Sequence, residues 1–147
     1  YCAYISGLVL ANAGLGTVHG MAGPMGGLFN IPHGTACANL LPGVIRETTR
    51  ALAHADQAHP ALVKYRTAAG LLNPDGPGAL EGLSPEESGI FLADLLDSWV
   101  VRMAVPTLSR YGIGPDEIPA IIPVSGQKNN PAPLSQKAME DILFSRI

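Results

Sequence analysis

Apolar residues recur along this chain at the spacing of α-helices rather than of β-strands. No run alternates apolar and polar residues for long enough to predict a strand. The spacing instead predicts helices over residues 2–13, 17–29, 33–52, 60–72, 84–103 and 135–146, with shorter helical turns over 107–111 and from 114 onward. The predicted fold class is therefore all-α.

Several polar residues and prolines mark where these helices begin or bend. Ser84 and Glu87 have the spacing of a capping box, in which each side chain accepts a hydrogen bond from the other residue's backbone. Ser135 and Thr17 are the predicted N-caps of the last helix and of the helix over 17–29. Pro42 falls inside the helix over 33–52, so a kink is predicted there.

Charge divides the chain into two unequal parts. Residues 1–45 contain no Asp, Glu, Lys or Arg, and all charged residues follow from Arg46 onward. A membrane-spanning helix is not predicted, because His19, Pro24 and several glycines interrupt the apolar run. We interpret residues 1–45 as a buried segment of one domain, beginning with a buried helix over 2–13. Amphipathic helices form the rest, over residues 46–147.

The overall composition limits the partners and the cellular compartment expected for this chain. Hydrophobic residues make up 47% of the chain and charged residues only 14%, so much of the surface should be hidden, either in the chain's own core or against another polypeptide. A homo-oligomer is expected, and otherwise residues 1–15 should be left exposed. The net charge of −3 gives no footprint for nucleic acid or for a membrane surface. Cys2 and Cys37 are predicted as small buried hydrophobes in a reducing, cytoplasmic compartment, and no signal peptide is visible.

Two histidines in the uncharged part are the candidates for chemistry. His19 and His33 are each followed by a glycine, which leaves room for a ligand, and a neutral imidazole binds Fe²⁺ or Zn²⁺ well. Their spacing of 14 residues matches no compact metal motif, so hydrogen-bonded core histidines are the alternative. Either way the pair cannot complete a metal site alone.

Three other patterns carry weaker signals. His54 and His59 are five residues apart, so on a helix they point to different sides and are predicted to be solvated. Cys37 lies on the same helical face as His33, but a buried thiol is favoured over a nucleophile. The glycines from Gly14 to Gly23 lack the spacing of a dinucleotide fingerprint, which favours close helix packing instead.

Longer motifs connect the chain to a family. The stretch Gly14–Pro42, which contains both candidate histidines, closely resembles the second signature of the iron-containing alcohol dehydrogenases. Residues 64–68 and 129–135 are similar to closing segments of the same family. The resemblance covers essentially the whole chain, and the first motif is long and has many fixed positions.

The resemblance implies a helical metal-binding domain cut off at its N-terminal side. Family members have an N-terminal α/β half that binds NAD(P) and an all-helical C-terminal half. They hold one divalent metal, iron or sometimes zinc, with one Asp and three His. Two of these histidines match His19 and His33, while the other ligands and the NAD(P)-binding domain would precede Tyr1. No catalytic residue is assigned and the nucleotide contacts stay unknown. This chain alone is expected to be inactive.

The implied activity is oxidation of a small alcohol or reduction of an aldehyde. Many members carry a further histidine where this chain has Gly23, so a proton relay through that position is not expected. Residues 125–128 resemble the branch that lacks this histidine. Two alternatives stay open: a maleylacetate-type oxo-acid reductase, and a non-catalytic helical module that has lost metal binding.

Overall fold

A computed structural model describes residues 1–127 and 129–147, and these residues form helices and loops without a strand. Lys128, part of the stretch over 125–128 discussed above, lies outside them. The elements, in chain order, are α1 (Cys2–Ala13), α2 (Thr17–Phe29), α3 (His33–Ala55), α4 (Pro60–Leu72), η1 (Pro77–Leu80), α5 (Pro85–Arg102), η2 (Leu108–Tyr111), η3 (Pro115–Glu117), α6 (Ile118–Ile121), η4 (Ile122–Val124) and α7 (Gln136–Phe144). The all-α prediction is confirmed.

Most helix boundaries agree with the sequence pattern. α2 and α4 have the predicted bounds, and α3 runs through Pro42 and ends three residues later than predicted, at Ala55. The prediction of Thr17 as the N-cap of α2 was wrong. Gly16 has the extended N-cap conformation, and Thr17 is the first helical residue with a fully buried side chain.

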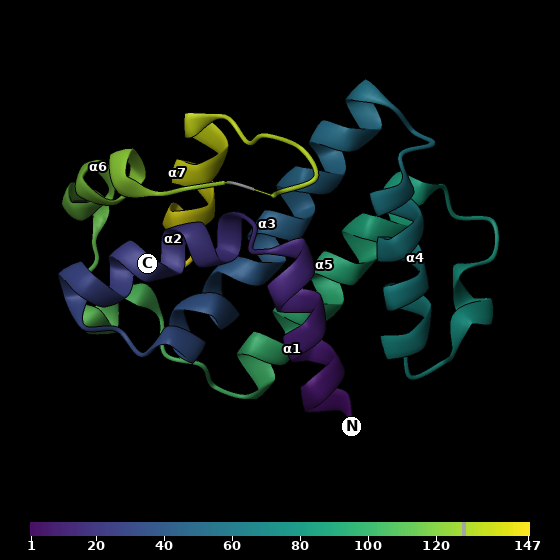
Figure 1. Ribbon diagram of the computed structural model, residues 1–147, viewed down its shortest axis with the longest axis horizontal. Helices are drawn as coiled ribbons and strands as arrows, with labels where there is room; N and C mark the ends of the chain where they lie inside the picture. The colour runs from purple at the N-terminus through teal and green to yellow at the C-terminus, as the bar shows by residue number, and fades with distance from the viewer. Residues whose placement is uncertain (128) are drawn as a thin grey trace.

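The packing of the helices centres on α3. Helix α5 lies alongside α3, α4 packs against α5, and α2 packs against the first part of α3 (Figure 1). Helix α7 and the short elements α6 and η4 cover the same end of the molecule as α2. This arrangement places the first turn of α2 beside the N-terminal half of α3.

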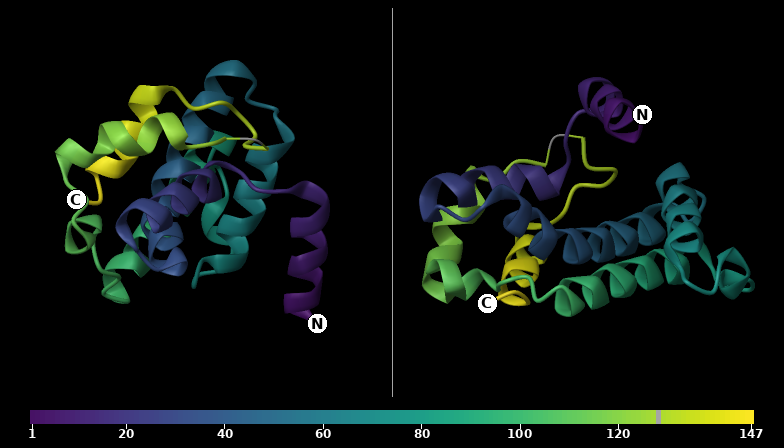
Figure 2. Two further views of the ribbon diagram at one scale, coloured as in Figure 1. Left: turned by 60° about the vertical axis from the view of Figure 1, so that its left-hand side comes forward. Right: turned by 90° about the horizontal axis from the view of Figure 1, so that it is seen from below.

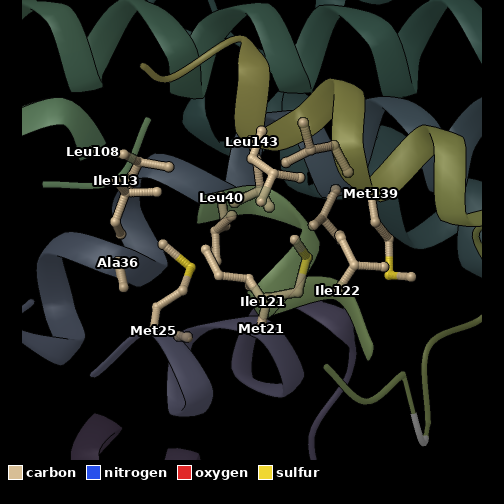
Figure 3. Packing of buried hydrophobic residues seen from close by; sticks show 14 of the residues in the cluster. Met21, Met25, Ala36, Leu40, Leu108, Ile113, Ile121, Ile122, Met139 and Leu143 are labelled. Atoms are coloured by element: carbon tan, nitrogen blue, oxygen red, sulfur yellow. The ribbon is translucent and has the colours of Figure 1, made fainter. Parts of the chain in front are cut away.

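The largest core cluster lies at the end where α2, α3 and α7 meet. Figure 3 shows Met21 and Met25 from α2 facing Leu40 of α3 and Leu143 of α7. All four side chains are fully buried. Smaller clusters fill the contacts between α3, α4 and α5. The core thus anchors α2 and α3 by their inner faces.

Helix α1 corrects one prediction from the sequence. It was expected to be a buried helix, but every residue from 1 to 15 is exposed, Cys2 included, and Tyr4 is 69% exposed. Figure 2 shows α1 standing away from the body of the molecule. Its apolar side chains form a surface that would ordinarily be buried, yet no other described residue packs over it. Either a homo-oligomer or exposure of residues 1–15 was expected from the composition, and these residues are exposed.

The same apolar segment bears on membrane spanning. Within the described residues, no single helix is both long and apolar enough to cross a membrane. The pair of α1 and α2 passes by length and composition together, but the two helices are bent by 95° at the break between them.

The predicted capping box at the start of α5 is confirmed. Ser84 Oγ accepts a hydrogen bond from the backbone N–H of Glu87 at 3.1 Å, and Glu87 Oε2 accepts one from the N–H of Ser84 at 2.7 Å. The bonds from Ser84 lower the pKa of the Glu87 carboxyl. The bond to the Glu87 carboxylate is therefore present at neutral pH and weakens as the pH falls through that lowered pKa, while the bond to Ser84 Oγ stays.

Removing this cap should destabilise the protein. Ser84→Ala leaves an N–H of the first turn without its acceptor, and we expect the free energy of unfolding to fall by about 1 kcal/mol. Urea denaturation followed by circular dichroism measures the change. Ser98→Ala is the matched control, because Ser98 is an exposed residue within α5 whose hydroxyl only bonds its own helix. Equal stability of the two variants would contradict the prediction.

Candidate metal centre

The structure brings the two candidate histidines together at the starts of consecutive helices. His19 lies in the first turn of α2, and His33 is the first residue of α3. The turn between the helices passes through Asn30 in the left-handed conformation, with φ of 52°, and through the buried Ile31. The two imidazole centroids lie 5.2 Å apart with their planes tilted by 44°. Both side chains are exposed, so the alternative of two buried core histidines does not describe them.

Cys37 completes a cluster of three ligand-type side chains. It lies one turn after His33 on α3, and its Sγ is 3.4 Å from His33 Nε2. One ligand atom from each of His19, His33 and Cys37 lies within 4.8 Å of the others. Among the described residues, no carboxylate belongs to this cluster. The cysteine is half-buried rather than buried, and burial raises the pKa of its thiol.

A close backbone contact holds the His19 end of the cluster. Gly126 donates its N–H to the carbonyl oxygen of Gly20 at 3.1 Å. A Cβ on Gly20 would overlap the carbonyl oxygen of Gly126, so only glycine allows this approach. The predicted role of these glycines in close packing is thereby explained for Gly20. The contact ties the first turn of α2 to a loop more than 100 residues away in the sequence.

The same loop also binds the segment between α1 and α2 through two hydrogen bonds. Asn129 Nδ2 donates to the carbonyl of Ala13 at 2.7 Å, and the Asn129 N–H donates to the carbonyl of Leu15 at 3.3 Å. Gly14 ends α1 with a φ of +70°, a conformation that favours glycine. The glycines here shape a helix junction.

Two side-chain amides give the loop its own shape. Gln127 closes a pair of hydrogen bonds with the backbone of Leu134, at 2.8 Å through its Nε2 and 2.6 Å through its Oε1. Asn130 Nδ2 donates to Thr48 Oγ1 on α3 at 3.0 Å. The loop therefore links α3 to the start of α2, where His19 lies.

A cavity of about 390 Å³ opens beside the cluster. Its walls include His19 and Cys37 together with apolar side chains such as Val18 and Leu41. The Thr17 hydroxyl is buried close by and has no hydrogen-bond partner among the described residues. The cavity thus combines an apolar lining with ligand-type atoms at one end, as small-molecule sites commonly do.

Tyr65 of α4 reaches the far side of this cavity. Burial raises the pKa of its phenol, and a hydrogen bond with Thr48 lowers it by a smaller amount. The phenol therefore stays protonated at neutral pH and presents an uncharged wall.

The other histidines lie away from the cluster. His54 is exposed in the last turn of α3, as predicted. His59 differs from the prediction of a solvated side chain, because it is half-buried and caps α4 by accepting the N–H of Ala61 on Nδ1 at 3.2 Å. A histidine just before a proline at the first position of a helix is a signal of this role that sequence reasoning missed.

The cluster fits a divalent transition-metal ion by its donor chemistry. Imidazole nitrogens suit iron, zinc and copper, and a thiolate suits zinc. Three donors leave a position open, which is the arrangement of catalytic rather than structural zinc sites. Sequence spacing alone did not identify Cys37 as a neighbour of His19, because that contact depends on how α2 folds back onto α3.

Comparison with known proteins places these observations in context. Residues 1–147 match the family model described as Fe-containing alcohol dehydrogenase family, C-terminal. The chain is 34% identical over 119 residues to lactaldehyde reductase of Escherichia coli, covering 80% of this chain and 28% of that protein. It is 30% identical over 142 residues to the NADPH-dependent butanol dehydrogenase of Clostridium saccharobutylicum, covering 96% of this chain and 30% of that protein.

A solved structure agrees with these matches. The crystal structure of a 1,3-propanediol oxidoreductase superposes with a TM-score of 0.77 at 25% sequence identity, over 96% of this chain and 35% of that one. The present chain therefore spans about a third of the length of the proteins it resembles.

Proposed function

The chain belongs to the Fe-containing alcohol dehydrogenase family, and from this premise we propose that it supplies two metal ligands, His19 and His33, to an NAD(P)-dependent alcohol or aldehyde oxidoreductase. The pairing of the two imidazoles, whose centroids lie 5.2 Å apart and of which His19 lines an apolar cavity, is the observation that carries the proposal. Fe²⁺ is the proposed ion and Zn²⁺ the alternative, since imidazole binds both.

Each part of the site has a task in this reaction. When bound, the ion would supply Lewis-acid polarisation of the substrate oxygen, and NAD(P) would supply the hydride acceptor or donor. His19 and His33 hold the ion through neutral imidazole nitrogens. The apolar side chains of Val18 and Leu41 receive the carbon chain of the substrate and keep water away from the reacting carbon.

The names of the similar proteins guide the substrate class. They refer to lactaldehyde, butanol and 1,3-propanediol, which are small alcohols or an aldehyde. We therefore favour a small alcohol over an oxo-acid of the maleylacetate type and over a module without catalysis. Assembly as a homo-oligomer, joining of this chain to an NAD(P)-binding domain and a cytoplasmic location are parts of the same proposal.

Metal removal tests the proposal directly. We expect the complete natural enzyme that contains this chain to reduce NAD⁺ or NADP⁺ with a small primary alcohol, because the ion stabilises the alkoxide. Chelation should abolish the rate, and Fe²⁺ or Zn²⁺ should restore it. Mg²⁺ is the matched control and should not, since it prefers oxygen ligands. Alcohol oxidation that persists after elemental analysis shows the metal to be gone would overturn the proposal.

A further inference from the structure

A third side chain stands where it can reach the ion proposed above. We infer that Cys37 is a thiolate ligand to the ion held by His19 and His33, which makes the centre a mixed nitrogen–sulfur site. This inference rests on the proposed metal centre and adds to it. Cys37 is not one of the ligands, one Asp and three His, that the family resemblance implies.

The distance between donors fits coordination of one ion. Metal–nitrogen bonds of about 2.0–2.1 Å and a zinc–sulfur bond of about 2.3 Å place neighbouring tetrahedral donors roughly 3.3–3.6 Å apart. Cys37 Sγ and His33 Nε2 already stand 3.4 Å apart. An ion at that spacing would contact both atoms without movement of α3.

The remaining donor is within reach of the same ion. All three ligand atoms lie within 4.8 Å of one another, so closing onto one ion requires a shift of roughly 1 Å from His19. Its imidazole is exposed, and exposed side chains change rotamer freely. The backbone of the α2 first turn is held by the Gly20–Gly126 contact, so the shift falls on the side chain alone.

The geometry of α3 places His33 and Cys37 on the same side of the helix. Residues four apart on a helix lie on one face, so His33 and Cys37 point the same way at its N-terminal end. Cys37 also lines the cavity beside the cluster, where its sulfur has open space on one side. Cys37 packs in part against the core cluster, but its side chain is only half-buried, unlike the fully buried side chains of Met21 and Leu40.

The chemistry balances without any added reactant. Binding breaks the S–H bond of the thiol, the sulfur forms a bond to the divalent ion, and one proton leaves to solvent. No electron is transferred. A thiolate donor favours Zn²⁺ and Co²⁺ over ions that prefer oxygen, such as Mg²⁺.

Cobalt substitution tests the ligand directly. The complete natural protein is stripped of metal and loaded with Co²⁺, and we expect a thiolate-to-cobalt charge-transfer band in the near ultraviolet. Cys37→Ser should remove the band and weaken Zn²⁺ binding by about 10-fold or more, comparing with losses seen for residues that only support a ligand. Cys2→Ser is the matched control, because Cys2 lies on the exposed helix α1, and it should keep the band.

Two outcomes separate this inference from the proposed function. If Co²⁺ binds with dependence on His19 and His33 but the unmodified protein shows no charge-transfer band, Cys37 is not a ligand while the metal centre stands. If no Co²⁺ binds, both are overturned. The spectrum of the unmodified protein decides the point even if Cys37→Ser fails to fold, and a band that survives in a folded Cys37→Ser variant also refutes the inference.

Discussion

Replacing His33 by alanine is expected to lower the affinity of the protein for Fe²⁺ or Zn²⁺ by at least about 100-fold, because substitutions of residues that merely orient a ligand already cause losses of that order. His19→Ala should do the same. Each removes one of the two imidazoles that stand 5.2 Å apart at the starts of α2 and α3. Titration with metal in competition with a chromogenic chelator measures the affinity.

Stability and a distant histidine serve as controls for this result. Both side chains are exposed, so the free energy of unfolding without metal should change by less than about 0.5 kcal/mol. His54→Ala removes an exposed histidine at the other end of α3 and should leave metal affinity unchanged. A His33→Ala protein that binds metal as tightly as the His54→Ala protein would exclude His33 as a ligand.

Among these variants, Gly20→Ala is expected to produce the largest loss of stability, about 3 kcal/mol of the free energy of unfolding, at the upper end of what overpacking typically costs. A methyl group there would overlap the carbonyl oxygen of Gly126. Both sides of this contact are backbone and are joined by the hydrogen bond of 3.1 Å between Gly126 N–H and Gly20 O. Neither can swing aside as a side chain would, so the clash must be relieved by separating the loop from α2.

The matched control lies on the same helix. Gly27 has open space around its Cα within the described part of the chain, so Gly27→Ala should be neutral or stabilise the protein by up to about 1 kcal/mol through helix propensity. Guanidinium denaturation measures the free energy of unfolding of both variants. It should fall for Gly20→Ala and should stay the same or rise for Gly27→Ala. If Gly20→Ala is also neutral, the loop does not hold the start of α2 as described.

Local signals in the sequence predicted the helices well. The bounds of α2 and α4 follow from turn residues on both sides, and the capping box of Ser84 and Glu87 is a pattern confined to four residues. Each of these features depends on atoms close together in the chain. A single sequence therefore contains what is needed to place them.

Contacts between distant segments were beyond such reasoning. The loop that contacts Gly20 and Ala13 is separated from them by more than 100 residues, and no periodicity links the two parts. The burial predicted for α1 was wrong, although exposure of residues 1–15 was the stated alternative, because apolar composition reports a need for burial without naming the surface that meets it. Likewise, the approach of His19 to Cys37 depends on the three-residue turn between α2 and α3.

Both helices that present the histidines begin without a capping side chain. Gly16 and Pro32 occupy the N-cap positions of α2 and α3, and neither offers a side-chain acceptor to the first N–H groups. Each of these helix ends therefore carries the partial positive charge of its unpaired N–H groups, which raises the electrostatic potential beside its first turn. A bare cation is opposed by that potential, whereas an oxygen that acquires negative charge beside it is stabilised. The backbone at the start of each helix thus favours a negatively charged group beside its first turn even before any side chain acts.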